Sequence, residues 1–388
     1  MNPLRKPAVT LRWIFGIAYS VRRLLPKQMV NCFGPRQSHE DRTIGKIYVI
    51  NLDREPRRWS RVNDELKRIH DRLGNDLRSL SERFSAVDAR NFTNGPPEDG
   101  EIDPHYTLSD QLFVEPQPRT LPSRFELEAP IAMTGAEVAV ARSHIGVWKR
   151  VAEGAEDYTL ILEDDVWFHP RFARDLDQAW QDMRGAHDGA GGIDIVYVSY
   201  MEATNGAPKA FLSSNVFKPE RGLWYLSGYI LSRRGARKLL DALPCRGPVD
   251  LWINHQFSKL NVFATRQSIV GQRRDSISTN TYSILPALSG IGAINSEGAA
   301  LFHARPPGAP VIGFGLPGSG QSSLAMALSM LGYACCSDLR RLPAPEWNRL
   351  SGFPLGFADG AMFFIEKSKG SGEHPVAGHI SKFGLVLF

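Results

Sequence analysis

Cysteine and long apolar runs are both scarce in this sequence. Four of its 388 residues are cysteines, two of them adjacent, and none lies at a spacing typical of metal ligands. The cysteines therefore indicate neither a disulfide framework nor a zinc site, and their scarcity favours a reducing compartment. A long basic run interleaved with aromatic residues is also missing, so we do not expect nucleic acid as a partner.

The apolar stretch near the start, residues 13–21, is far shorter than the roughly 20 residues of a membrane-spanning helix. Basic residues follow it instead of a small-residue cleavage pattern, which argues against a signal peptide. A basic segment lying on a membrane surface and a frayed terminus fit residues 1–44 equally well. We expect a cytoplasmic protein without a transmembrane helix, with peripheral membrane contact through this segment as an open alternative.

What is present is an ordinary globular composition, with 43% apolar and 22% charged residues and a net charge of +5. The mild positive excess suits anionic partners such as nucleotide-sugars and acidic glycans. Short apolar runs and helical periodicity alternate through residues 45–280, and Thr134 with Glu137 gives a capping-box pattern before one helix. This alternation predicts an α/β fold with a mainly parallel sheet flanked by helices.

Two segments interrupt the alternation. Residues 91–122 are rich in proline, glycine and acidic residues, and an irregular insertion of that length is uncommon in a compact domain unless it is functional or disordered. We expect a mobile flap there. Residues 281–310 are rich in serine, glycine, alanine and proline, which predicts a linker to a small C-terminal module at 311–388.

An acidic triplet, Glu163-Asp164-Asp165, directly follows the apolar residues 160–162. Ligands gather at the carboxyl ends of strands in α/β sheets, and adjacent carboxylates repel unless a cation or a proton offsets their charge. Because successive strand residues point to opposite sides, we expect Glu163 and Asp165 to share a side. Two carboxylates completed by phosphate oxygens suit Mn²⁺ or Mg²⁺. A solvated acidic turn is the alternative for the triplet taken alone.

Three longer segments resemble glycosyltransferase family 25, the lipooligosaccharide and collagen galactosyltransferase-like group. They are KIYVINLDREPRR with FSAVDAR, then MTGAEVAVARSHIGVWKRVAEGAEDYTLILEDDV, then GLWYLSGYILSRRGARKLLDALPCRGPVDLWI. They occur in the family's order and cover residues 45–280. The resemblance implies a GT-A-like, Rossmann-related fold, a nucleotide-sugar donor and inversion at the sugar carbon.

The same resemblance implies roles for particular residues. Glu163 and Asp165 would bind the metal ion, and Asp165 would also be catalytic. The donor would be bound by the residues Asn51, Asp53, Arg54, Arg57 and Asp88. Arginine suits this role because its guanidinium matches phosphate oxygens, although a solvated helix face is an equally good interpretation of Arg57 and of its neighbour Arg58.

An inverting transfer needs a base for the acceptor hydroxyl, and Asp250 matches the family's acidic position after the Arg-Arg-Gly-Ala helix. A helix N-cap is the alternative role for Asp250. Ser143 and His144 are candidates for contacting the metal ligands without contacting the metal ion themselves. His255 is a further candidate for contact with metal or phosphate.

Two aromatic residues, Trp224 and Tyr225, lie on an apolar strand of the third matching segment. They are candidates for a platform under an acceptor sugar, with a place in the core as the alternative.

The C-terminal module contains GLPGSGQSS, with glycines at P-loop spacing but Gln321 in place of the P-loop lysine. Gly315, Gly320, Gln321 and Ser322 form a candidate anion loop at a helix start. The stretch VIGFGLPGSGQSSLAMALSMLGY resembles the phosphosulfate loop of sulfotransferases. We expect residues 311–388 to be a degenerate, truncated sulfotransferase-like module with a partial P-loop-like α/β fold and no activity.

Together these features predict a metal-dependent inverting glycosyltransferase. It would move a hexose, expected to be galactose, from a UDP-sugar to a glycan or glycoconjugate such as lipopolysaccharide. The alternatives are a sulfotransferase-like nucleotide-binding protein and a retired enzyme that serves as a glycan-binding or scaffold protein. The intact triplet favours an enzyme, since a retired site is expected to lose its mutually repelling carboxylates first.

Overall fold

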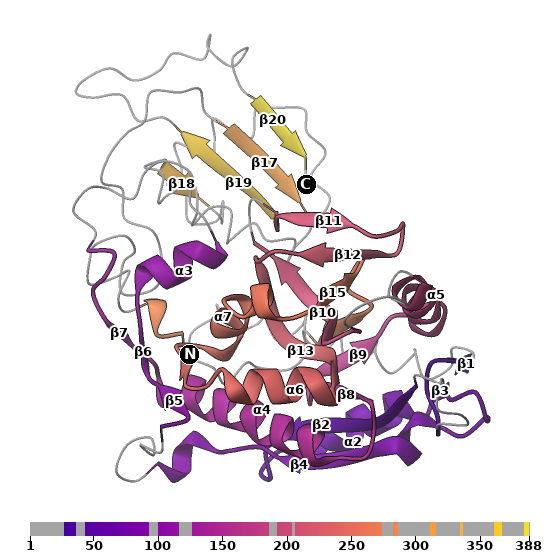
Figure 1. Ribbon diagram of the computed structural model, residues 1–388. Coiled ribbons are helices and arrows are strands. Elements are labelled where there is room, and N and C mark those ends of the chain that lie inside the picture. Colours follow the sequence, from indigo (N-terminus) through magenta and orange to yellow (C-terminus); the bar gives the residue numbers. More distant parts are fainter. Residues whose placement is uncertain are drawn as a thin grey trace, which may run out of the picture. The chain divides into compact units, whose positions relative to one another are not determined.

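The computed structural model describes residues 27–35, 43–92, 100–115, 126–185, 192–203, 206–273 and 282–285, together with four strands between 311 and 387 (Figure 1). Contacts divide the chain into two units, residues 1–116 with 130–282 and residues 117–129 with 283–388. Within the described part, every helix is too short or too polar to cross a membrane.

An eight-stranded sheet forms the centre of the first unit, in the order β11-β12-β15-β10-β13-β8-β2-β4. In that order the strands are Lys209–Phe211, Val216–Pro219, Val262–Thr265, Ile195–Glu202, Leu223–Ser232, Tyr158–Glu163, Ile44–Asn51 and Ser81–Ser85. β2 runs parallel to β8 and β4, and β10 runs parallel to β15. The other four neighbouring pairs are antiparallel.

The prediction of a mainly parallel sheet is therefore wrong, because the sheet is mixed. The reversal is at β13, which runs antiparallel to both β8 and β10. A parallel return needs a long crossover, usually a helix. Between β10 and β13 the chain forms the β11–β12 hairpin instead, so it re-enters the sheet in the opposite direction.

Helices flank both faces of this sheet, as predicted. On one face are α2 (Pro56–Leu66) and α5 (Phe172–Gly185), whose apolar residues share a buried cluster with Leu160 and Leu162 of β8. On the other face are α4 (Gly135–Glu153), α6 (Arg233–Asp241) and α7 (Val249–Asn254). Figure 1 shows α4 and α6 side by side along the sheet. The capping box predicted for Thr134 and Glu137 starts α4.

Shorter elements complete the first unit. They are β1 (Gln28–Met29), β3 (Ile69–His70), η3 (Leu77–Leu80), η4 (Ala89–Asn91), β5 (Ile102–Asp103), β6 (His105–Tyr106), α3 (Leu108–Val114), β7 (Ile131–Ala132), β9 (Val166–Phe168), β14 (Cys245–Arg246), η5 (Phe257–Lys259) and β16 (Val270–Gln272).

The prediction of an irregular flap over residues 91–122 is wrong for residues 100–115. There β5 pairs with β14, β6 pairs with β7, and a Thr107–Asp110 capping box starts α3. The proline-rich composition concealed these elements because each is only two to seven residues long. Residues 93–99 and 116–122 lie outside the described residues.

In the second unit the structure describes four strands in the order β18-β19-β17-β20. They are Ala334–Cys336, Ala361–Glu366, Val311–Gly315 and Gly384–Leu387. β17 runs antiparallel to β19 and parallel to β20. Gly315 ends β17, whereas Gly320, Gln321 and Ser322 lie outside the described residues, so the anion loop stays a prediction.

Candidate functional site

Glu163 is the last residue of β8, at the carboxyl end of the strand. Side chains alternate along a strand, so Glu163 lies on the same face as Ile161, which pairs with Tyr229 on the side of α4. There its Oε1 lies 3.6 Å from His144 Nε2, and its Oε2 accepts a hydrogen bond of 3.4 Å from Gln272 Nε2. Glu163 is therefore held between α4 and the end of β16.

Asp164 points to the opposite face and has different partners. Its Oδ2 accepts a 2.7 Å hydrogen bond from Asn51 Nδ2 at the end of β2, and its Oδ1 lies 3.1 Å from Arg58 Nη1 on α2. Burial raises the pKa of Asp164, while Asn51 and Arg58 act to lower it. This carboxylate therefore links β2 to α2. The middle acid of the triplet thus has a structural role that requires no bound ligand.

Asp165 has an unpartnered carboxylate oxygen. Its Oδ1 is buried and has no hydrogen-bond partner among the described residues. Burial, followed by the charges of Glu163 and Asp164, raises the pKa of Asp165 to about 7. A cation would satisfy the oxygen and offset this repulsion.

The described residues fit a divalent cation in one particular way. Among them, His, Cys, Asp and Glu do not gather in threes as metal ligands. Two carboxylates are nevertheless enough for Mg²⁺ or Mn²⁺ when phosphate oxygens and waters complete the coordination. The fit rests on Asp165 Oδ1, an acceptor oriented by the fold and left without a donor.

Asp250 lies in the first turn of α7, where Pro248 occupies the N-cap position. The N-cap interpretation of Asp250 is therefore wrong. Its carboxylate accepts hydrogen bonds from the backbone N–H groups of Tyr225 and Leu251. Burial is the main cause that raises the pKa of Asp250, and the charge of Glu163 raises it further. This environment favours a carboxylate that can accept a proton.

Tyr225 presents its N–H to Asp250 from an unusual backbone conformation. Its φ is +74°, a left-handed value that residues other than glycine rarely adopt. The register of β13 against β10 shifts here, because Ser199 pairs with Gly228 but Met201 pairs with Trp224. The Tyr225 ring is half-buried, whereas Trp224 is only 8% exposed and belongs to the core. Of the two candidates for an acceptor platform, Tyr225 is the accessible one.

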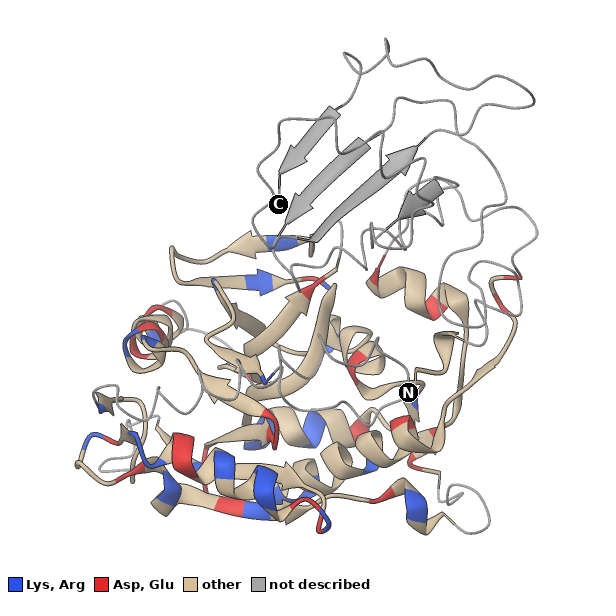
Figure 2. Ribbon diagram, turned by 180° about the vertical axis from the view of Figure 1, so that it is seen from behind, with Lys and Arg blue, Asp and Glu red and all other residues tan. Residues whose placement is uncertain are grey.

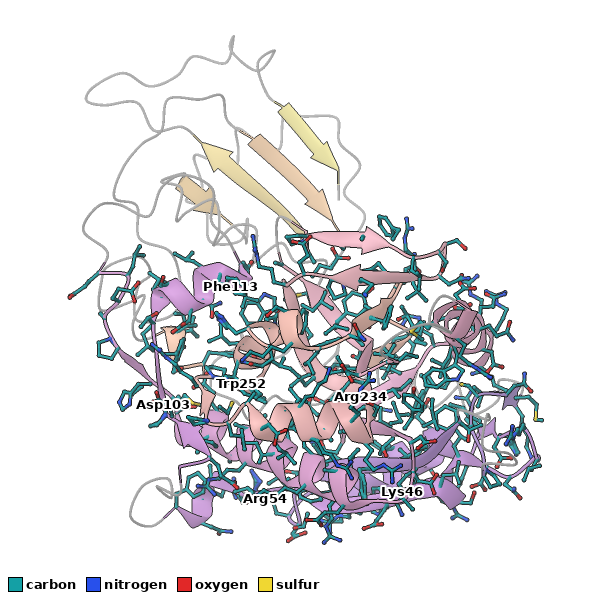
Figure 3. All side chains as sticks on the ribbon, viewed as in Figure 1. Lys46, Arg54, Asp103, Phe113, Arg234 and Trp252 are labelled. Atoms are coloured by element: carbon teal, nitrogen blue, oxygen red, sulfur yellow. The ribbon has the colours of Figure 1, made fainter. Side chains whose placement is uncertain are left out.

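The predicted donor residues surround the loop after β2. Asp53 accepts hydrogen bonds from Arg83 and Ser85. Arg54, which Figure 3 labels, pairs with Asp88 at 3.3 Å.

Arg57 and Asn51 differ in their surroundings. Arg57 is exposed on α2, and the neighbouring Arg58 is the arginine that reaches the acidic triplet. Asn51 is 1% exposed and is occupied with Asp164. Figure 2 shows basic and acidic residues interspersed over the ribbon of the first unit.

Ser143 and His144 are neighbours on α4 with separate roles. Ser143 Oγ donates to the Ala139 carbonyl and accepts from the Val87 N–H, which fastens the loop that carries Asp88. His144 is the one that contacts Glu163.

His255 lies at the contact between α7 and α3 rather than with the acidic triplet. Its ring stacks on Phe113 with centroids 4.4 Å apart, and its Nε2 lies 3.3 Å from the Asp110 carbonyl oxygen. Burial lowers the pKa of His255.

Sequence reasoning missed two residues of the site, Tyr229 and Gln272, and it gave Arg58 only the interpretation of a solvated helix face that it also gave Arg57. The sequence could not separate Arg58 from Arg57, because the contact of Arg58 with Asp164 depends on which face of α2 packs toward the end of β8. Tyr229 and Gln272 gave no signal, because one lies in an apolar strand and the other just before a serine-rich stretch.

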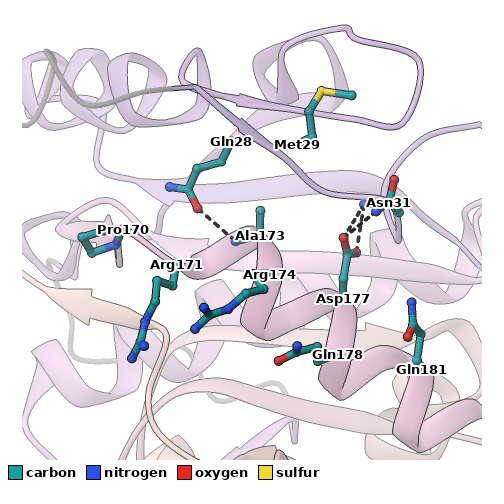
Figure 4. Close-up of a pocket in the computed structure, with 10 residues that line it drawn as sticks. All are labelled: Gln28, Met29, Asn31, Pro170, Arg171, Ala173, Arg174, Asp177, Gln178 and Gln181. Carbon is teal, nitrogen blue, oxygen red and sulfur yellow. Dashed lines mark hydrogen bonds between the residues drawn. The ribbon is translucent and has the colours of Figure 1, made fainter.

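A separate cavity of about 480 Å³ lies between β1 and α5 (Figure 4). Two of its polar side chains are engaged within the protein: Gln28 accepts from the Ala173 N–H, and Asp177 accepts from the N–H and amide group of Asn31. None of the ten lining residues is a predicted site residue.

The raised pKa of Asp165 predicts a pH-dependent stability. In the unfolded chain this carboxyl ionises near pH 4, whereas the metal-free native state keeps its proton until about pH 7. The native state therefore binds more protons between these values, and its free energy of unfolding falls as pH rises from about 4 to 7 by an amount on the order of 4 kcal/mol. We expect urea unfolding of Asp165→Asn to lack this component. An equal pH slope in both proteins would contradict the assignment.

Comparison with known proteins decides the family. The family model of glycosyltransferase family 25 (LPS biosynthesis protein) matches residues 44–253, which include the acidic triplet, His144 and Asp250. The chain belongs to glycosyltransferase family 25. The match covers every strand of the mixed sheet except β15, and it includes the acidic triplet at the end of β8.

Several curated proteins are similar to this family 25 chain. A glycosyltransferase 25 family member of Aedes aegypti is 27% identical over 234 residues, 60% of this chain and 34% of the relative. A procollagen lysyl hydroxylase and glycosyltransferase of Acanthamoeba polyphaga mimivirus is 27% identical over 206 residues, 51% of this chain and 20% of the relative. Procollagen galactosyltransferase 2 of Mus musculus is 29% identical over 133 residues, 33% and 20% respectively. The chain thus spans about a third or less of the length of these relatives.

Proposed function

We propose that this chain is a metal-dependent, inverting glycosyltransferase that moves a hexose from a UDP-sugar to a glycan or glycoconjugate. The observation that carries the proposal is the group of carboxylates at the end of β8, in which Asp165 has a buried, unpartnered oxygen beside Glu163. Family membership supports sugar transfer as the reaction. Galactose is the hexose we propose, because relatives named procollagen galactosyltransferases match the chain. Lipopolysaccharide is one acceptor that the family description supports.

In this proposal Glu163 and Asp165 hold Mn²⁺ or Mg²⁺. The cation, when bound, would neutralise the charge that develops on the departing diphosphate. Asp250 would take the proton of the attacking acceptor hydroxyl, and Tyr225 would offer its half-buried ring to the acceptor sugar. Arg54 and Arg58 lie on the donor side, where guanidinium groups favour phosphate oxygens.

The test is release of UDP from a panel of UDP-sugars with Mn²⁺, with and without chelator. We expect one sugar to give chelator-sensitive release that returns when Mn²⁺ is restored, and that Asp165→Asn lowers by at least about 100-fold. The preferred sugar would identify the donor. Release that persists unchanged in excess chelator would rule out the metal assignment.

A further inference from the structure

A chain of buried polar contacts leads from α4 to the acidic triplet through β13. Trp148 Nε1 donates to Tyr229 Oη at 2.8 Å, Tyr229 Oη lies 2.9 Å from His144 Nδ1, and His144 Nε2 lies 3.6 Å from Glu163 Oε1. Trp148 and Tyr229 are fully buried, and His144 is 1% exposed. His144 and Trp148 are four residues apart on α4, so both face the same strand residue.

The hydrogen-bond donors among Trp148, Tyr229 and His144 can be assigned one by one. The indole N–H can only donate, so the Tyr229 oxygen accepts from Trp148. Burial raises the pKa of Tyr229, so its hydroxyl keeps a single proton, and the remaining partner for that proton is His144 Nδ1. An imidazole that accepts at Nδ1 carries its proton on Nε2. That N–H faces Glu163.

Glu163 is held from two sides as a result. His144 faces its Oε1, and Gln272 donates to its Oε2 at 3.4 Å. The 3.6 Å separation is longer than a hydrogen bond, so in this structure His144 faces Glu163 without donating to it. Groups that orient a metal-binding carboxylate in this way change metal affinity by roughly 10–100-fold when they are removed.

We propose that Trp148, Tyr229 and His144 are positioning residues that fix the Nε2–H tautomer of His144 and thereby orient Glu163 toward the metal ion and the donor diphosphate. The inference rests on the proposed function, because it takes Glu163 as a metal ligand. Ser143, although adjacent, plays no part in it, since its hydroxyl is engaged with the Ala139 carbonyl and the Val87 N–H.

The test is the affinity for Mn²⁺ in the presence of UDP, measured by calorimetry without turnover, in full-length variants. We expect Tyr229→Phe to weaken Mn²⁺ binding by roughly ten-fold and His144→Leu by at least as much. His144→Gln keeps an N–H donor near the position of Nε2, so it is expected to restore most of the affinity. Adding Tyr229→Phe to His144→Gln should then cause no further loss.

Tyr197→Phe is the matched control. Tyr197 pairs with Tyr229 across β10 and β13 and is equally buried, and its hydroxyl has no hydrogen-bond partner among the described residues. Its loss should leave Mn²⁺ affinity unchanged. If Tyr197→Phe and Tyr229→Phe weaken binding equally, or if neither does, the positioning chain is refuted.

A metal-free readout separates this proposal from the proposed function. Nitrogen NMR of the His144 ring should show protonated Nε2 and unprotonated Nδ1 in the wild type, with a mixture in Tyr229→Phe. The opposite tautomer in the wild type would overturn the proposal whatever the metal does. If the expected tautomer is found but Mn²⁺ does not bind, the metal-dependent function is refuted. The contacts from Trp148 to Glu163 would then have no metal ligand to position.

Discussion

Asp250→Asn is expected to lower the turnover of sugar transfer by about 10²- to 10⁴-fold, the range typical of a lost general base. The asparagine side-chain oxygen can still accept from the N–H groups of Tyr225 and Leu251, so the fold around α7 should persist. Burial already disfavours the charged carboxylate, so the neutral variant should be no less stable at neutral pH. The loss therefore reports chemistry and not unfolding.

The measurement is turnover with the preferred UDP-sugar, beside the affinity for UDP and Mn²⁺. We expect that affinity to stay within about threefold, since Asp250 is proposed to act on the acceptor and not on the metal. Asp241→Asn, the same change at an exposed position at the end of α6, is the control. Equal turnover in the Asp250 and Asp241 variants would exclude Asp250 as the base.

Gly235→Ala is expected to lower the free energy of unfolding by about 3 kcal/mol. A Cβ at this position of α6 would lie well inside van der Waals contact with the backbone carbonyl of Asp194. That backbone has little freedom to yield, because the fully buried Asp194 carboxylate is held by Arg234 at 2.7 Å and by Lys238 at 2.8 Å.

Gly146→Ala is the matched comparison for Gly235→Ala, since both glycines lie inside helices. A Cβ at Gly146 would approach the tip of the Phe84 ring at 2.7 Å, and a ring can tilt where a backbone carbonyl cannot. Both substitutions gain about 1 kcal/mol of helix propensity. Urea unfolding should therefore show a loss for Gly146→Ala less than half that for Gly235→Ala. A larger loss at Gly146 would contradict this account of the packing.

Sequence patterns predicted the parts of the fold that depend on local chemistry. The capping box at Thr134 and Glu137 located the start of α4, and the apolar run before Glu163 located β8. The direction of β13 was not predictable, because a strand buried on both faces has the same apolar composition in parallel and antiparallel neighbours. Direction depends on how the chain returns to the sheet, which here is through a hairpin.

The candidate site was predictable to a similar degree. Alternation along β8 separates Glu163 from Asp164, as side-chain period alone requires. This alternation could not show that Asp164 interacts with Asn51 and Arg58, because those contacts join residues more than 100 positions apart. The choice between Arg57 and Arg58 depends on helical phase against a strand whose position the sequence does not specify.

The left-handed backbone of Tyr225 sets stability against function at one position. Glycine is the residue that most readily adopts a φ of +74°. A residue with a side chain in this backbone conformation destabilises the fold by about 1–3 kcal/mol. The ring beside Asp250 is what a proposed acceptor platform requires, and glycine has none. Selecting variants for thermal stability alone would therefore be expected to replace Tyr225 with glycine and remove the aromatic ring. Optimisation that rewards sugar transfer would retain the strain and accumulate its compensating changes elsewhere in the chain.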